Sequence, residues 1–495
     1  MLLDLAPVRS AWNRVALNRL LPECIMSTNT SVPFLRDSMP QCAVSACGIS
    51  LDLGRQRLTV KDFSHLFDIE REKGVLEANA AMRRGEIVNM SEHRAALHTA
   101  LRDPQLSAPF HKEVSETLER MCELAAEVRS GLRTGCRGDM ITDVINVGIG
   151  GSELGPRAVY HALRNPVPTI RLHFLAAADG VNFDRVVSGL NPFKTLVIVS
   201  SKSFKTRETA VNATAVDQWL LDAGISGKDR NKHMFVVSTS KSAARDMNLP
   251  DENLFPIWDW VGGRFSVWSA IGLADAIALG PEVFRGLLAG AYSMDRHVAS
   301  AKPGENLPLL LALLAYWNAT RNGMASHALL PYDERLRVIV SWLQQLEMES
   351  LGKNLSVKGE LIETPTGQCV WGGHGNVSQH SFYQWLREGT SNTSIDLLWC
   401  EKPGHKHAEL HRVLNANAKA QVEALVTRRV PEDKAFNAVT AISIEQLTPE
   451  TLGALMAMYE HKTSMLGTLY GINPFDQPGV ELGKKLSRQA ERQLA

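Results

Sequence analysis

The chain has 495 residues, with 53 lysines and arginines and 53 aspartates and glutamates, so its formal net charge is zero. This length is enough for two or more domains, each with a large core. The balanced charge argues against nucleic acid or an anionic membrane surface as a partner, and we expect neither.

The cysteines and the apolar runs both indicate a cytoplasmic protein without membrane spans. The seven cysteines are an odd and scattered set with no CxxC pair, which is typical of reduced thiols. The longest apolar run, Leu307 to Trp317, is shorter than the roughly 20 residues that span a bilayer. Three arginines lie between apolar residues near the start, but Asp4 and Glu23 argue against a transit peptide. We predict an amphipathic helix there instead.

Residues 1–108 form a region that we predict to be partly helical and partly irregular, packed on the domains that follow. Within it, Asn89 to Arg102 has apolar residues at helical spacing and an N-cap candidate at Ser91, so a helix is predicted. No spacing in this region indicates catalysis.

Residues 109–280 alternate between helical segments and short apolar runs, and form the first predicted domain. A helix is predicted over Glu113 to Leu132. Predicted strands lie at 143–147, 172–175, 196–199 and 235–237. Continuous apolar strands separated by helices are typical of an α/β fold with a doubly wound parallel sheet. Ligands of such sheets bind at the carboxyl ends of the strands.

Two loops of this domain follow predicted strands and carry groups that suit a phosphate. The first, Gly148 to Ser152, combines glycines that allow close approach with a helix N-terminus that favours an anion. Its GxGGS spacing fits neither a dinucleotide-binding motif nor a Walker loop. The second, Ser200 to Thr206, gathers hydroxyls and a lysine before a predicted helix. Each loop alone also fits an ordinary capped helix start, but two loops from one sheet favour a phosphate site.

A third segment, Phe255 to Ser266, places Arg264 after two glycines and close to aromatic residues. A shielded guanidinium can stabilise a developing oxyanion. The alternative is that the arginine stacks on Trp258 or Trp260 as part of the packing.

The second half of the chain is predicted to contain another parallel sheet. Residues 281–325 are predicted to form connecting helices, residues 326–470 a second α/β domain, and residues 471–495 a C-terminal segment that ends in a basic, polar helix. The predicted strands are 328–330, 369–371, 395–400 and 439–444, and the predicted helices are 334–351, 380–388, 408–428 and 449–470.

Gln345, Glu349 and Lys353 fall at successive i+4 positions of the 334–351 helix and share one face. A salt-bridged face in solvent is the common explanation. A carboxylate in a partly apolar pocket is, however, what proton abstraction beside a carbonyl requires.

Four histidines are candidate functional residues. His380 lies at the start of a predicted helix, where a capping or core histidine is the usual explanation. His405, His407 and His411 lack an accompanying acidic ligand motif, so exposed histidines are favoured over a metal site.

Taken together, these segments resemble the glucose-6-phosphate isomerase family from about Asn89 to Lys485. The matching motifs, in the family's order and at about its spacing, are VGIGGSELGP, SSKSFKTRET, DWVGGRFSVWSAIGL, QQLEMESLGKN, QHSFYQ and NPFDQPGVELGKK. The resemblance implies two sugar-isomerase (SIS) domains and an aldose–ketose isomerisation of glycolysis and gluconeogenesis, through a cis-enediol and without a metal or other cofactor. It also implies a homodimer in which each chain delivers His380 to the site of its partner.

The resemblance further implies a role for each matching residue. Glu349 would be the base, Arg264 would stabilise the enediolate, and Lys484 and His380 would assist opening of the sugar ring. The residues implied to bind substrate are Gly151, Ser152, Ser201, Lys202, Ser203, Thr206, Gln345 and Gln477.

The chain departs from the family's usual residues at four of these positions or beside them. Ser203 stands where a threonine is usual, Lys205 and Arg207 where uncharged residues are usual, and Leu351 where an asparagine is usual. These departures bear on affinity and rate more than on the type of reaction.

Two alternative functions fit the same fold. One is a protein that senses sugar phosphates without converting them, and the other is an isomerase for a different phosphosugar. A sensor needs the phosphate loops but no base, so the presence of Glu349, His380 and Lys484 favours the enzyme.

Overall fold

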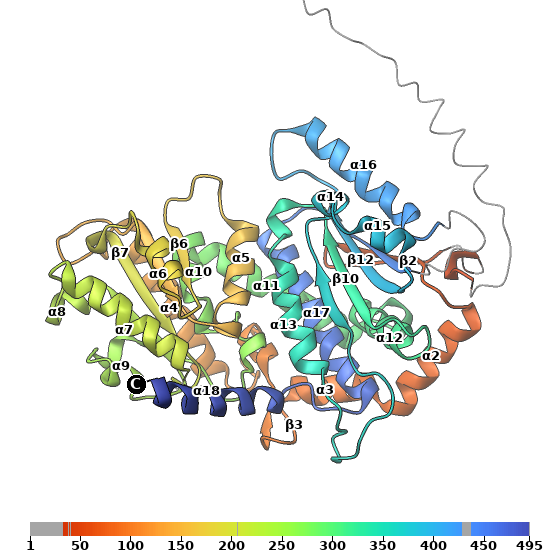
Figure 1. Cartoon of the computed structure of the whole chain (residues 1–495), viewed down its shortest axis with the longest axis horizontal. Coiled ribbons are helices and arrows are strands. Elements are labelled where there is room, and N and C mark those ends of the chain that lie inside the picture. The colour runs from red at the N-terminus through yellow and green to blue at the C-terminus, as the bar shows by residue number, and fades with distance from the viewer. Residues whose placement is uncertain (1–32, 38, 40, 205, 428–436, 495) are drawn as a thin grey trace, which may run out of the picture.

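The computed structural model describes residues 33–37, 39, 41–204, 206–427 and 437–494. Two sheets, each flanked by helices, lie side by side, with long helices packed between them (Figure 1). The helix predicted near the start of the chain and Lys205 lie outside the described residues.

The first sheet has five parallel strands in the order β6-β5-β7-β8-β9. They are β5 (Asp143–Val147), β6 (Arg171–Leu175), β7 (Thr195–Ser200), β8 (Met234–Ser238) and β9 (Leu254–Pro256). The central strands β5, β7 and β8 are buried along their whole length, as expected for a sheet covered on both faces. The four predicted strands are confirmed. The prediction missed β9, which has only three residues, one of them a proline at the edge of the sheet.

Seven helices of the described chain surround this sheet. They are α4 (His111–Ser130), α5 (Leu154–Leu163), α6 (Gly180–Val187), α7 (Arg207–Asp222), α8 (Gly227–Arg230), α9 (Ala243–Asp246) and α10 (Leu273–Leu279). The predicted helix over 113–132 is α4, which buries Met121, Leu124, Ala125 and Val128 at three- and four-residue spacing. It packs against α10 and ends at Gly131, whose φ of 78° is left-handed.

The second sheet has six strands in the order β1-β2-β13-β12-β10-β11. They are β1 (Ala43–Ala46), β2 (Ile49–Arg55), β10 (Ser326–Pro331), β11 (Cys369–Gly372), β12 (Thr393–Cys400) and β13 (Ala438–Ile444). The four predicted strands β10 to β13 are parallel, as expected. The N-terminal region adds β1 and β2 in antiparallel pairing, so the prediction of only helical and irregular structure there is wrong. The alternation of buried Ile49, Leu51 and Leu53 is the period-2 signal of β2.

The helix predicted over Asn89 to Arg102 is wrong. After α2 (Val60–Lys73) and α3 (Val75–Arg84), the chain forms β3 (Ile87–Asn89), a turn, β4 (Arg94–Ala95) and a 3-10 turn at His98–Leu101. His93 in the turn has a left-handed φ of 50°, which a helix does not allow. Ser91 is no N-cap, because its hydroxyl donates to the carboxylate of Asp476. A hydrogen bond to Asp476, 385 residues later in the chain, therefore holds Ser91 in this turn.

Long helices fill the space between the sheets. They are α11 (Pro281–Ser300), α13 (Ile339–Leu351) and α17 (Pro449–Tyr470), while α12 (Leu307–Thr320) packs against α17 from the side of the second sheet. The longest, α17, is buried over nearly its whole length and packs against the other three. Its buried charged residues are paired: Glu460 accepts from Arg102 at 2.6 Å, and Lys462 donates to Glu347 at 2.8 Å. Buried charges need such partners, so α17 fixes the position of α13, which carries Glu347.

Three further helices pack on the second sheet: α14 (Gly375–Ser378), α15 (Tyr383–Glu388) and α16 (Ala408–Ala424). The predicted helix 380–388 thus begins later, at Tyr383, and His380 lies in the turn between α14 and α15. The predicted helix 334–351 also begins later, at Ile339, after a 3-10 turn at Glu334–Leu336. Among the described residues, no helix is long and apolar enough to cross a membrane.

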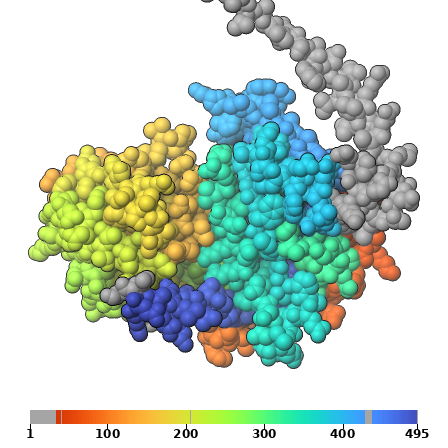
Figure 2. Space-filling model, viewed as in Figure 1, coloured from red at the N-terminus to blue at the C-terminus, as the bar shows by residue number. Residues whose placement is uncertain are grey.

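The last helix, α18 (Glu481–Leu494), lies on the surface. It runs beneath the first domain, where Figure 2 shows it as a dark blue ridge next to the yellow-green atoms of that domain. Arg207, the first residue of α7, donates from Nε to Glu491 on α18 at 2.7 Å. The C-terminal helix is therefore tied to the helix that follows the Ser200–Thr206 loop.

Candidate active site

The Gly148–Ser152 loop, the Arg264 segment and α13 converge between the two sheets. A Cβ atom at Gly151 would overlap the carbonyl group of Gly263, so only glycine allows this approach. A Cβ atom at Gly150 would lie 3.1 Å from Nε2 of Gln345 on α13. The glycine loop thus touches both the segment and the helix that carry the predicted catalytic residues.

Arg264 is buried and held by four hydrogen bonds. Its Nε donates to Ser350 Oγ at 2.6 Å, and its Nη1 donates to Gln477 Oε1 at 2.9 Å. Its Nη2 donates to the carbonyl oxygens of Pro474 at 2.6 Å and Asp476 at 3.1 Å. A guanidinium has five N–H donors, so these four bonds leave one donor without a partner among the described residues, and it is on Nη1.

Glu349 lies next to that remaining donor. Its Oε2 is 3.6 Å from Arg264 Nη1, which is too long for a hydrogen bond but close enough for an ion pair. The side chain of Glu349 is 24% exposed, so the carboxylate is shielded yet open to a ligand. Burial lowers the pKa of Arg264, while the nearby Glu349 and Asp476 raise it. Arginine stays charged in proteins, so the site holds a fixed cation beside a carboxylate.

The aromatic residues near Arg264 do not stack on it in the way the alternative explanation required. The rings of Trp258 and Trp260 stack on each other, with centroids 5.2 Å apart and an interplanar angle of 12°. Arg264 lies instead 5.6 Å from the ring of Phe265, its neighbour in sequence. The stacking explanation is wrong for the two tryptophans, and the hydrogen bonds fix the guanidinium.

The Ser200–Thr206 loop presents two hydroxyls at the start of α7. Ser201 is buried, and its hydroxyl has no hydrogen-bond partner among the described residues. Thr206 precedes α7 but its side chain makes no capping hydrogen bond. An unpaired buried hydroxyl costs free energy, which an anionic ligand at this helix N-terminus would recover.

The ammonium group of Lys202 is hydrogen-bonded within the protein and does not extend into solvent. Its Nζ donates to the carbonyl oxygens of Asp259 at 2.8 Å and Val261 at 2.7 Å. Burial is the main reason why the pKa of Lys202 falls to about 8. The lysine thereby ties the predicted phosphate loop to the segment that leads to Arg264.

The remaining predicted binding residues lie at the same junction or at its edge. Gln477 accepts from Arg264, and Gln345 has a buried Oε1 with no partner among the described residues. Ser152 does not cap α5, which begins at Leu154, and its carbonyl oxygen accepts from Asn146 at 2.9 Å. Ser203 is exposed on the loop before α7.

Lys484 and His380 are not brought to Glu349 within this chain. The Nζ of Lys484 donates to Glu481 on the same exposed helix at 2.7 Å. His380 is exposed and follows α14, which lies above the second sheet in Figure 1, whereas the loop after α13 lies at the lower edge. Because α13 rises about 1.5 Å per residue, Glu349 is about 15 Å along the helix from Ile339. Element α14, which ends two residues before His380, therefore lies toward the start of α13, whereas Glu349 lies near the end of α13.

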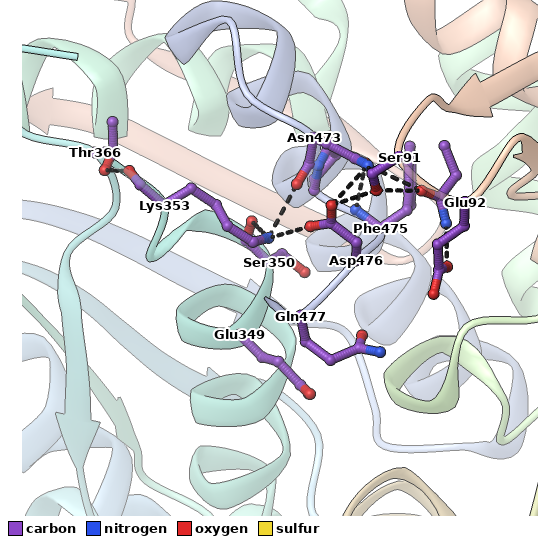
Figure 3. Close-up of polar contacts among 12 residues, drawn as sticks. Ser91, Glu92, Glu349, Ser350, Lys353, Thr366, Asn473, Phe475, Asp476 and Gln477 are labelled. Carbon is purple, nitrogen blue, oxygen red and sulfur yellow. Dashed lines mark hydrogen bonds and ion pairs between the residues drawn. The ribbon is translucent and has the colours of Figure 1, made fainter. Parts of the chain in front are cut away.

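A polar network behind Arg264 was not predicted from the sequence (Figure 3). Lys353 Nζ donates to the carbonyl oxygens of Ser350 at 2.8 Å and Asn473 at 2.9 Å. It also pairs with Asp476 Oδ1 at 3.2 Å, and Asp476 accepts from Ser91 on the β3–β4 turn. The i+4 spacing from Glu349 to Lys353 is a signal of proximity, but two of the three partners of Lys353, Asn473 and Asp476, lie more than 100 residues away.

No group of three or more His, Cys, Asp or Glu side chains in the described ranges is arranged to hold a metal ion. In the histidine cluster, His411 Nε2 lies 2.9 Å from the carbonyl oxygen of Glu401. A cavity of about 560 Å³ lies elsewhere, between α3 and α11, and none of the predicted site residues lines it.

Comparison with known proteins identifies the family of the chain. A family model described as phosphoglucose isomerase matches residues 52–495. The chain belongs to the phosphoglucose isomerase family. Glucose-6-phosphate isomerase 2 of Cupriavidus pinatubonensis is 43% identical, over 91% of this chain and 88% of that protein. The glucose-6-phosphate isomerase of Ralstonia pickettii is 39% identical, over 94% of this chain and 90% of that protein.

A solved structure supports the same membership in the phosphoglucose isomerase family. The crystal structure of a glucose-6-phosphate isomerase from Chlamydia trachomatis matches with a TM-score of 0.82 and 30% sequence identity. The match covers 92% of this chain and 90% of that chain. The α/β arrangement of two sheets is thus the fold of the phosphoglucose isomerase family.

Proposed function

We propose that the cluster of Arg264, Glu349 and Gln477 is the catalytic site at which this chain interconverts glucose 6-phosphate and fructose 6-phosphate. The interconversion itself follows from membership of the phosphoglucose isomerase family and from relatives that match about 90% of the chain. The catalytic steps and the residues that perform them are the proposal.

One observation supports this proposal most directly. Four hydrogen bonds fix the Arg264 guanidinium, and the donor left over on Nη1 lies beside the Glu349 carboxylate. A base next to a fixed cation is the arrangement that proton abstraction beside a carbonyl needs, because charge develops on the carbonyl oxygen as the proton leaves. No reorganisation of Arg264 is required when that charge appears.

The reaction then runs as a proton transfer between neighbouring carbons. With the sugar open, Glu349 takes the proton from C2 of glucose 6-phosphate, and the electron pair moves to make the enediolate with its charge on O1. The N–H of Arg264 Nη1 donates to the enediolate. The O2 proton passes to O1, and Glu349 returns its proton to C1, which gives the ketose. A cis-enediol presents both carbons to the same side, so one carboxylate serves both steps.

The phosphate is assigned to the Ser200–Thr206 loop. The unpaired hydroxyl of Ser201 and the side chain of Thr206, which makes no capping hydrogen bond, lie in the loop that leads from β7 into α7, whose N-terminal dipole favours an anion. Ser203 completes the set of hydroxyls, and Lys202 adds positive charge while it holds the loop to residues 259–261. Gly151, Ser152, Gln345 and Gln477 are assigned to the sugar side of the pocket.

Ring opening is assigned to Lys484 and to His380 of the partner subunit in a homodimer. Support for a shared site comes from the exposure of His380, which follows α14, whereas Glu349 lies near the end of α13. Two apolar neighbours, Val377 and Trp385, are also 67% and 42% exposed, as expected of a surface that a second copy covers.

We place the enzyme in the cytoplasm, as expected from its scattered cysteines, which are unpaired among the described residues.

A coupled assay of fructose 6-phosphate conversion, with and without EDTA, tests the proposal. We expect full activity in EDTA, since the polarising group is Arg264 and not a metal. Activity that disappears on chelation and returns with a divalent metal contradicts the proposed chemistry. Binding of the sugar phosphate without turnover would instead indicate a sensing protein, and turnover of another phosphosugar alone would indicate a different isomerase.

A further inference from the structure

Lys353 lies just beyond the end of α13 and turns its side chain back under the helix. Its ammonium group has three donors, and three acceptors surround it: the carbonyl oxygens of Ser350 and Asn473, and Asp476 Oδ1. The side chain is only 11% exposed. A lysine buried to this degree, with two hydrogen bonds and an ion pair, is a fixed part of the structure rather than a solvated surface charge.

Lys353 and Arg264 join the same two parts of the molecule. Arg264 binds Ser350 Oγ at the end of α13 and the carbonyl oxygens of Pro474 and Asp476 in the 473–477 loop. Lys353 binds the carbonyl oxygen of Ser350 and the same loop at Asn473 and Asp476. Figure 3 shows the lysine reaching from the end of the helix to the loop, with Glu349 and Gln477 close by.

The opposite side of the loop is held mainly by neutral groups. Asn473 Nδ2 donates to Asn89 Oδ1 and Ser91 Oγ, both at 2.9 Å, and Ser91 donates to Asp476. Within the described part of the chain, Lys353 is the cation that pairs with Asp476. An ion pair of low exposure is stronger than one in solvent, so the lysine is, beside Arg264, a second charged link between loop and helix.

We propose that Lys353 is a positioning residue for the isomerisation. It holds the 473–477 loop against the end of α13, so that the carbonyl oxygens of the loop orient Arg264. Nη1 of Arg264 then stays beside the carboxylate of Glu349. The inference rests on the proposed function and goes beyond it, because no step of that mechanism uses Lys353. Lys353 does not touch the substrate in this proposal, and it acts only through Arg264 and the helix end.

The test compares Lys353→Met, Lys353→Arg and Lys358→Met, an exposed lysine in the following loop that serves as the control. We expect Lys353→Met to lower kcat by about 10- to 100-fold, because a misplacement of about 1 Å has that effect on a catalytic group. The KM and the inhibition constant of inorganic phosphate should change by less than about 3-fold, since the phosphate loop is separate. Lys353→Arg should recover part of kcat, and Lys358→Met should equal the wild type.

Hydrogen–deuterium exchange supplies a readout independent of turnover. Exchange in a peptide over residues 472–480 should rise in Lys353→Met and stay unchanged in Lys358→Met. If Lys353→Met folds poorly, Asp476→Asn keeps the shape and removes the charge pair, and should lower kcat in the same direction. The double variant should then be no worse than Lys353→Met alone, because both changes break one link.

Two results would overturn the inference. One is a normal kcat in Lys353→Met, and the other is a loss of activity that only follows a lowered melting temperature and faster exchange throughout the protein. If the wild type itself fails to convert fructose 6-phosphate, the proposed function is wrong, and the exchange at residues 472–480 still decides whether Lys353 positions the loop.

Discussion

Arg264 and Glu349 lie 3.6 Å apart although they come from different halves of the fold. Arg264 follows the last strand of the first sheet, and Glu349 lies on α13 beside the second sheet. The pair therefore exists only when the two halves are packed together. Arg264 itself bonds to Ser350, the neighbour of Glu349, so each residue of the pair helps to place the other.

The first prediction is that Glu349→Gln abolishes isomerisation but keeps the fold and substrate binding. An amide cannot accept the C2 proton, so the rate should fall by several orders of magnitude. Exchange of substrate hydrogen with deuterated solvent, followed by NMR, should disappear in parallel. Glu360→Gln, in the exposed loop after α13, is the matched control. Near-normal exchange in Glu349→Gln would assign the base to another residue.

The second prediction concerns the shape of the cation. Arg264→Lys keeps the charge but cannot bind Ser350, Gln477 and the loop carbonyls together, because an ammonium group lacks the planar fork. We expect kcat to fall by about 100- to 1000-fold, as for the loss of an oxyanion donor. Thermal unfolding should show a lower melting temperature, since buried acceptors lose their partners. A lysine variant with wild-type kcat would exclude the proposed role.

The third prediction is that Ser201→Ala weakens phosphate binding without loss of stability. A charge-assisted hydrogen bond contributes about 1.5–3 kcal/mol, so the inhibition constant of inorganic phosphate should rise by roughly 10- to 150-fold. Its melting temperature should not fall, because the hydroxyl has no partner among the described residues in the unliganded chain. Thr214→Ala, on an exposed position of α7, provides the comparison. An unchanged inhibition constant would remove Ser201 from the phosphate site.

The fourth prediction is that two inactive chains complement each other. Mixing Glu349→Gln with His380→Ala allows a heterodimer in which one site contains both an intact Glu349 and an intact His380. Activity should rise above the sum of the two parents once native mass spectrometry shows subunit exchange. Exchange without recovery of activity would mean that His380 acts within its own chain.

The fifth prediction concerns Asp275, which is fully buried in α10, with neither carboxylate oxygen bonded among the described residues. Burial raises the pKa of Asp275 well above its usual value. The native state therefore keeps the proton while the unfolded state loses it above about pH 4. The native state is consequently destabilised progressively as the pH rises through the interval between the unfolded and the folded pKa.

Asp275→Asn should remove that pH dependence. Urea unfolding at several pH values should show similar free energies for the two proteins near pH 4 and a growing advantage of the variant at higher pH. Asp184→Asn, on the exposed face of α6, controls for the change in net charge. If the free energies of unfolding of variant and wild type change in parallel with pH, the carboxylate of Asp275 is stabilised by a partner in the native state.

The sequence by itself determined the elements whose periodicity is local. Buried apolar runs fixed β5, β7 and β8, the heptad-like spacing of apolar residues fixed α4, and the glycine spacing of the Gly148–Ser152 loop predicted a close approach that Gly151 makes. The family motifs also predict Arg264 and Glu349 as site residues. Each of these signals is contained within a short stretch of sequence, so packing elsewhere in the molecule does not alter it.

Only the tertiary structure decided which of these groups meet. Ser91 looked like a helix cap, but its hydroxyl finds Asp476, 385 residues away, and the helix gives way to a turn. Lys202 looked like a free phosphate ligand, yet it bonds to the carbonyl oxygens of residues 259 and 261. Lys353 binds a loop 120 residues later in the chain. Hydrogen bonds to distant backbone carbonyls depend on where packed helices place that backbone, and no local pattern of side chains encodes that position.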